Sequence, residues 1–123
     1  MDYKELMVGD WVMNACDTPR KVYELVQDQV TYELEGGGLN TTHCNQLYPI
    51  PLTEEILMKI SDFKVRGEYV ISGKARNPYI RIAWSRDKEK FYFSTLGSNC
   101  YLDYVHQLQH LLRLVGTDKE IEL

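Results

Sequence analysis

The sequence lacks a long hydrophobic run, a closely spaced cysteine pair and a recognisable catalytic motif. Its longest apolar stretches are far shorter than the roughly 20 residues that a helix needs to cross a bilayer, so we expect no membrane partner. The three cysteines, Cys16, Cys44 and Cys100, form no C-x-x-C pair, which argues against a disulfide framework and a structural zinc site. The acidic start, MDYKELMVGDWV, shows no basic segment followed by an apolar one, so we expect no secretory signal and a cytoplasmic protein.

Patterns that suggest catalysis are few, and none is specific. His43 and Cys44 could be a base beside its nucleophile, but neighbouring residues of a strand point to opposite faces, so direct pairing is not expected. The stretch GEYVISGKA fails the P-loop pattern in its glycine spacing and in the alanine that follows Lys74. We therefore expect no enzyme activity and no cofactor.

Charge is distributed unevenly along the 123 residues. The composition is that of an ordinary globular protein, with 44% hydrophobic and 26% charged residues. The net charge is −4, yet residues 1–52 carry eight acids against three bases, whereas residues 59–90 carry nine bases against four acids. An acidic first half suits a basic partner, and a basic middle segment suits an anion.

Residues 1–52 have the pattern of a small β-barrel. Four or five short strands follow one another in this segment, with Asp28-Gln29 as one turn and the triple glycine at 36–38 as another. Val30, Tyr32 and Leu34 alternate with polar residues, as in a strand with one buried face.

Residues 53–123 have the pattern of an α-β-β-β-α subdomain, which we expect to pack with the first segment as one unit. Thr53 is a good cap for the first helix, and Ser98 or Asn99 can cap the last one. Between the two helices, the sequence predicts an antiparallel meander with strands at 68–72, 79–85 and 91–95.

The basic segment contains the main candidate binding site. Between residues 73 and 92, basic side chains alternate with aromatic ones, a combination that suits phosphates and stacked bases. The alternative is a solvated hairpin whose basic residues protect its edges, with Trp84 packed inward. The residues expected to bind an anionic ligand, either a nucleotide or a nucleic acid, are Lys74, Arg76, Tyr79, Arg81 and Arg86.

The predicted C-terminal helix carries a secondary candidate, for a metal ion. Asp103, His106 and His110 fall together on the face opposite the apolar stripe, and a zinc site uses ligands of these types. The sequence specifies neither a fourth ligand nor supporting groups around the histidines. The interpretation that we favour is therefore that both histidines are solvated or lie at an interface, with no metal.

Three stretches resemble a group of small proteins without an assigned activity, common in Bacteroides-type gut bacteria and in their phages and mobile elements. These stretches are VGDWV near the start, LYPIPLTEEIL at 47–57 and YVHQLQHLLRLVGTDKEIEL at 104–123, in the same order. The resemblance implies a stand-alone intracellular accessory protein. VGDWV is also similar to the opening strand of SH3-like barrels, which implies a domain that binds peptides, proteins or nucleic acids.

These features together predict an α+β protein, with an N-terminal SH3-like small β-barrel followed by a helix, a three-stranded antiparallel sheet and a C-terminal helix. We expect a non-enzymatic binding or regulatory protein that occupies the surface of a host protein, for example a nuclease or a defence factor. The alternative is a protein that sequesters nucleotides or nucleic acid on residues 73–92. Either function is compatible with a homo-oligomer.

Overall fold

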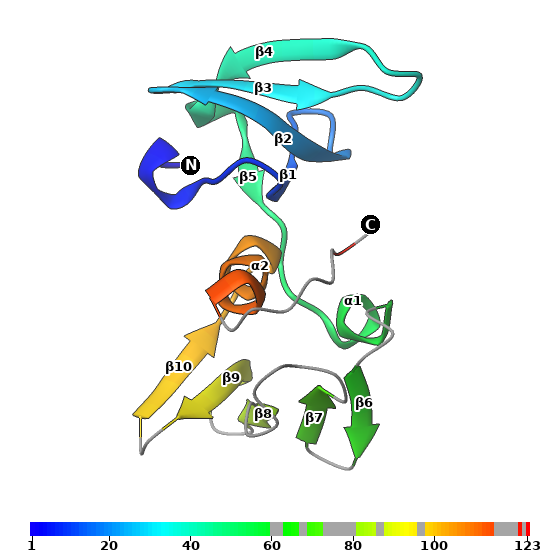
Figure 1. Cartoon of the computed structure of the whole chain (residues 1–123), viewed down its shortest axis with the longest axis vertical. Coiled ribbons are helices and arrows are strands. Elements are labelled where there is room, and N and C mark those ends of the chain that lie inside the picture. The colour runs from blue at the N-terminus through cyan, green and yellow to red at the C-terminus, as the bar shows by residue number, and fades with distance from the viewer. Residues whose placement is uncertain are drawn as a thin grey trace. The chain divides into compact units, whose positions relative to one another are not determined.

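The chain combines α-helices with antiparallel β-sheets, which confirms the α+β class (Figure 1). This computed structural model describes residues 1–59, 63–66, 69–72, 81–85, 88–95, 98–114, 121 and 123. The chain divides into two compact units, Met1–Ile50 and Pro51–Leu123. Over the described residues, none of the helices has both the length and the apolar character that crossing a membrane requires.

The N-terminal unit is built on a five-stranded antiparallel sheet with the strand order β4-β3-β2-β1-β5. Its elements are the 3-10 helix η1 (Tyr3–Glu5), the strands β1 (Trp11–Met13), β2 (Pro19–Val26), β3 (Gln29–Glu33) and β4 (Leu39–His43), the 3-10 helix η2 (Cys44–Gln46) and the strand β5 (Tyr48–Pro49). The turn between β2 and β3 lies at Gln27-Asp28, one residue before the predicted turn.

This sheet does not close into a barrel within residues 1–50. β4 and β5 occupy its two edges, and no strand pairing joins them. β5 has only two residues, and Pro49 has no N–H with which to extend the ladder toward β4. The register of β2 against β3 shifts between Val22 and Glu24, so Tyr23 is the extra residue of a β-bulge.

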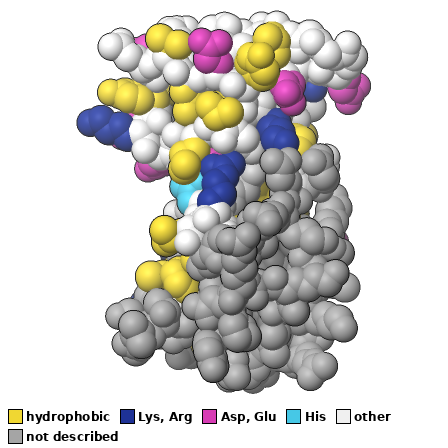
Figure 2. All heavy atoms as spheres, in the orientation of Figure 1, with side chains coloured by type: hydrophobic (Ala, Val, Ile, Leu, Met, Phe, Trp, Pro, Cys, Tyr) yellow, Lys and Arg dark blue, Asp and Glu magenta, His cyan; other side chains and the backbone are white. Residues whose placement is uncertain are grey.

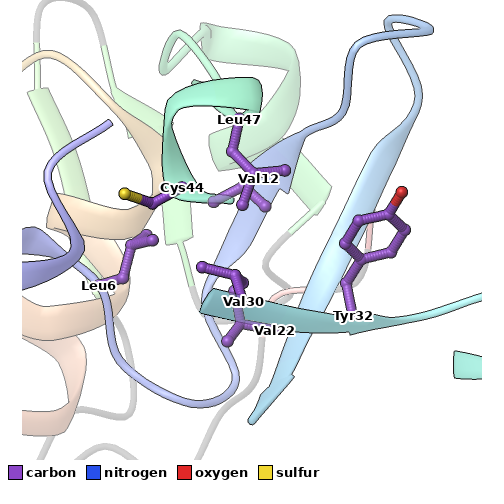
Figure 3. Close-up of a cluster of buried hydrophobic side chains, with 7 residues drawn as sticks. All are labelled: Leu6, Val12, Val22, Val30, Tyr32, Cys44 and Leu47. Atoms are coloured by element: carbon purple, nitrogen blue, oxygen red, sulfur yellow. The ribbon is translucent and has the colours of Figure 1, made fainter. Parts of the chain in front are cut away.

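The core of the N-terminal unit lies on one face of this sheet. Val30 and Tyr32 are buried there, which confirms the predicted alternation along β3. Leu34 lies beyond the end of β3 and is 37% exposed, because the chain reverses at Gly36 and Gly37, whose φ values are 84° and 93°. Figure 3 shows the buried cluster, which consists of Leu6, Val12, Val22, Val30, Tyr32, Cys44 and Leu47.

The C-terminal unit contains a second antiparallel sheet, with five strands instead of the predicted three, in the order β10-β9-β8-β7-β6. Its elements are α1 (Glu54–Lys59), β6 (Phe63–Arg66), β7 (Tyr69–Ser72), β8 (Arg81–Ser85), β9 (Lys90–Thr95), β10 (Ser98–Leu102) and α2 (Val105–Leu114). The predicted strands overlap β7, β8 and β9, whereas β6 and β10 were not expected. β10 pairs with β9 from Ser98 to Leu102, and such cross-strand pairing is not encoded in a local pattern.

The start of α1 is the one that the sequence predicts. The Thr53 hydroxyl accepts the N–H of Ile56 at 3.3 Å, and the Thr53 carbonyl accepts the N–H of Leu57 at 3.1 Å. A side-chain oxygen at this position satisfies a donor that the first helical turn would otherwise leave without a partner.

The start of α2 differs from the prediction. Ser98 and Asn99 lie in β10, so they do not cap the helix. Instead, Oε1 of Gln107 accepts the N–H of Asp103 at 2.7 Å and the N–H of Tyr104 at 3.1 Å. A glutamine at the third helical position that reaches back in this way is one half of a capping box.

Candidate protein-binding surface

A β-bulge and a tight turn present apolar side chains on the N-terminal unit. The N–H of Gly9 donates to the Val22 carbonyl, and the N–H of Val22 donates to the Asp10 carbonyl, both at 2.8 Å. These two bonds hold the turn at Val8-Gly9 against Val22, which directly precedes Tyr23, the extra residue of the bulge. We call three side chains the apolar patch: Met7, Val8 and Tyr23, which are 46%, 59% and 51% exposed.

A buried carboxylate fixes the turn that carries two of these residues. Asp10 has no exposed surface, and its Oδ2 accepts the N–H of Met7 at 2.8 Å. In return, the N–H of Asp10 donates to the Met7 carbonyl at 3.1 Å. Because a buried carboxylate is costly unless it is hydrogen-bonded, this pairing specifies one local conformation. Asp10 therefore has a structural role, although by sequence it counts among the acids of an acidic segment.

Most acidic side chains of the N-terminal unit lie on its surface. Among the bases, only Lys4 is exposed, whereas Arg20 and Lys21 are half-buried. Figure 2 shows acidic and hydrophobic side chains next to one another on the visible face of this unit, where Lys and Arg side chains also appear. Such a surface can bind a partner that offers basic and apolar groups together. The exposed acids are Asp2, Glu5, Asp17, Glu24, Glu33 and Glu35.

His43 and Cys44 lie closer together than the sequence suggests, because Cys44 begins η2 and does not continue β4. The Cys44 Sγ lies 3.9 Å from Nδ1 of His43, and His43 Nε2 lies 3.0 Å from Oδ2 of Asp28. This set has the residue types of a nucleophile, a base and an orienting acid. However, Nδ1 already accepts the N–H of Asn45 at 3.1 Å, so its single lone pair is occupied.

The position of Cys44 also argues against a catalytic role. Its side chain is 5% exposed and belongs to the hydrophobic core cluster of the N-terminal unit. A thiol enclosed by core side chains offers almost no surface that a substrate could reach. The contacts of His43 with Asp28 and Asn45 therefore stabilise the junction of β4 and η2.

The residues predicted to bind an anion lie almost entirely outside the described part of the chain. Arg81 is the first residue of β8. The binding site at residues 73–92 therefore stays a prediction. The other four members of that site, which fall outside the described residues, are Lys74, Arg76, Tyr79 and Arg86.

Two further basic residues of the same segment are described, and both have partners within the C-terminal unit. The Nζ of Lys88 lies 5.0 Å from the centroid of the Tyr101 ring, which is a cation–π distance. The Nζ of Lys90 lies 3.2 Å from Oδ1 of Asp103. Both side chains are largely solvated, so these contacts orient the lysines more than they stabilise the unit.

The predicted metal ligands are not gathered into one site. Asp103 pairs with Lys90, and His106 is 3% exposed, whereas the sequence places it on the solvent face. A helical wheel shows which residues share a face, but it does not show how much of the helix the surrounding chain covers. Among the residues that the structure describes, no three His, Cys, Asp or Glu side chains are arranged to hold a metal ion.

The two histidines of α2 pack as rings. Tyr104 stacks on His106 with 5.8 Å between centroids and 9° between planes, and His110 meets His106 edge-on at 5.7 Å. These distances and angles are those of ordinary aromatic pairs in protein interiors. The spacing of four residues thus serves packing along the helix.

Comparisons of the chain with protein-family models, with curated proteins and with solved structures found no match. The resemblance to small proteins of phages and mobile elements therefore stays a prediction.

Sequence reasoning missed the apolar patch. The one available signal was the adjacent pair Val22 and Tyr23, which breaks the alternation of apolar and polar residues along β2. Ordinary strand alternation turns Val22 into the core and leaves Tyr23 exposed, and the bulge at Tyr23 then shifts the register of the residues that follow.

Proposed function

We propose that this chain is a non-enzymatic accessory protein whose N-terminal unit binds a basic surface of a host protein. The observation that carries the proposal is the apolar patch among exposed acids. Tyrosine is enriched among the residues that dominate binding energy, and a turn whose backbone is bonded to Val22, the neighbour of Tyr23, carries the exposed Met7 and Val8 without a cost in loop ordering. The surrounding carboxylates would steer a basic partner and select against an acidic one.

The sheet of this unit supports a small SH3-like barrel as its architecture. β1 pairs with both β2 and β5, so the last strand of the unit returns to the first. The bulge at Tyr23 increases the local twist, which is how small sheets curve toward closure. A protein-binding role agrees with what the VGDWV resemblance implies.

A phage or mobile-element origin would make a host nuclease or defence factor the natural partner. Proteins that act on nucleic acids carry basic surfaces, because they neutralise phosphates with lysine and arginine. The exposed acids of the N-terminal unit would meet such a surface with opposite charge.

The proposal is tested by comparing matched surface variants of the full chain. The double variant Val8→Ser/Tyr23→Ser replaces the two most exposed side chains of the apolar patch, and Leu114→Ser is the control, because Leu114 is 84% exposed in α2 of the other unit. Each protein is immobilised, host lysate is passed over it at moderate salt, and the retained partner is purified for affinity measurements.

We expect the patch variant to bind the purified partner about tenfold or more weakly, the loss typical of a truncated binding hot spot, and the control to match the wild type. Glu24→Lys should slow association most at low salt. Unchanged binding by both the patch variant and Glu24→Lys would reject the proposal. Retention of nucleic acid without protein would instead favour the alternative function on residues 73–92.

A further inference from the structure

β4 is an open edge of the N-terminal sheet. In the described part of the chain its only neighbour is β3, and the pairing runs without a bulge from Gln29↔His43 to Glu33↔Leu39. The strand is exposed from Leu39 to Thr41. Its outer side therefore faces solvent over several residues in a regular extended conformation.

The hydrogen bonds at its two ends identify which residues of β4 face β3. The N–H of Cys44 donates to the Asp28 carbonyl, and the N–H of Leu34 donates to the Gly38 carbonyl, both at 2.7 Å. Opposed residues in an antiparallel ladder alternate between hydrogen-bonded and non-hydrogen-bonded pairs. Every second residue between Gly38 and Cys44 therefore bonds to β3.

The remaining residues of β4 direct their backbone groups away from the sheet. The alternation assigns Asn40 and Thr42 to the ladder with β3. The N–H and C=O groups of Leu39 and Thr41, and the N–H of His43, then point outward. This row of donors and acceptors is what an added strand would use.

The two edges of the sheet differ in how they are protected. Sheets usually guard their edges with proline, lysine, bulges or very short strands. β5 has two residues and contains Pro49, so it has two of these protections. β4, with the sequence LNTTH, has no proline, no lysine and no bulge. Within this sheet, β4 is thus the edge that can accept a strand.

We propose that β4 binds an extended, basic strand of a partner protein by strand addition to the sheet. This inference rests on the proposed function and specifies its contact. The charge next to β4 indicates which kind of strand it binds. Glu33 lies opposite Leu39 in β3, Glu35 lies in the loop after β3, and both glutamates are exposed. A second copy of this unit would bring its own eight acids and three bases to the edge, whereas lysine or arginine on a partner strand would be attracted.

A substitution at Thr41 distinguishes strand addition from other forms of binding. Thr41→Pro removes an outward N–H and leaves the ladder with β3 intact, because the N–H of Thr41 is not part of that ladder. Thr41→Val is the matched control. It keeps the N–H and loses only the hydroxyl, which lies 2.7 Å from the Thr31 hydroxyl.

The probe is a fluorescein-labelled, capped peptide that alternates lysine with valine, and binding to the full chain is followed by fluorescence anisotropy. We expect Thr41→Pro to weaken binding about tenfold or more, and Thr41→Val to stay within about twofold of the wild type. Two further peptides, N-methylated at the odd or at the even positions, test the wild-type protein alone. An added strand uses every second N–H of the peptide, so methylation at one set of positions should abolish binding and methylation at the other set should not. This result does not depend on whether Thr41→Pro folds.

Three outcomes would overturn this inference. The first is that the probe binds Thr41→Pro with the wild-type affinity but binds Glu33→Gln/Glu35→Gln weakly. Charge alone would then attract the peptide, and the proposed acidic binding surface would stand without strand addition. If the wild type does not bind the probe, β4 is not the contact, and the patch variants decide the proposed function separately. If the wild type dimerises with concentration and Thr41→Pro does not, the occupant is a second copy of this chain.

Discussion

Removing the buried carboxylate of Asp10 should destabilise the N-terminal unit more than the removal of any exposed acid. Asp10→Ala leaves the N–H of Met7 without its acceptor at 2.8 Å and opens a void at a site with no exposed surface. A hydrogen bond to a charged group is worth about 1.5–3 kcal/mol, so we expect the free energy of unfolding to fall by about 2–3 kcal/mol. At roughly 0.05–0.15 kcal/mol per residue, the 50 residues of the N-terminal unit have a total free energy of unfolding of about 2.5–7.5 kcal/mol, so this loss is a large fraction of it.

The assay is urea denaturation of the full chain, followed by tryptophan fluorescence. The chain has two tryptophans, and a Trp84→Phe background leaves Trp11, which directly follows Asp10, as the reporter. Asp10→Asn keeps an oxygen for the Met7 N–H and should lie between the wild type and Asp10→Ala. Glu24→Ala removes an exposed acid and should stay within about 0.5 kcal/mol of the wild type. An Asp10→Ala protein as stable as Glu24→Ala would refute the reasoning.

Three further predictions concern packing, capping and strand pairing. Leu47 is 1% exposed in the core cluster, so Leu47→Ala should lower the free energy of unfolding by about 2–5 kcal/mol in the same assay, and a loss below 1 kcal/mol would contradict this packing. Gln107→Ala removes both bonds at the start of α2 and should cost about 1–2 kcal/mol, with faster hydrogen exchange confined to the first turn of that helix. A double-mutant cycle of Thr31→Val and Thr41→Val should give a coupling energy of about 0.2–1 kcal/mol, whereas strict additivity would show that their hydroxyl contact has no energetic weight.

Much of the local structure was predictable because it depends on residues that are close in sequence. The alternation along β3 places Val30 and Tyr32 in the core, and Thr53 caps α1. The acidic character of the first half was equally plain, and most of its carboxylates are exposed. Periodicity, capping and charge are short-range properties, so they can be read directly from the chain.

The errors arose where residues distant in sequence decide the outcome. Ser98–Leu102 forms β10 because it pairs with β9, and His106 is buried because the chain around α2 covers more than one stripe of the helix. Asp10 and Glu24 are both acidic residues of the first half, but the fold buries Asp10 and leaves Glu24 exposed. Burial of a charged or aromatic side chain depends on what covers it, which no local pattern specifies.

The sequence by itself determined the α+β class, an acidic first half and the residues that form the core of β3. Only the tertiary structure decided which parts of that acidic half are exposed. The bulge at Tyr23 and the open edge at β4 both follow from strand register, since register determines which side chains are turned out of the sheet and which backbone groups are left without a neighbouring strand. Register is set by the pairing of several strands at once, so it belongs to the assembled sheet and not to any single stretch of sequence.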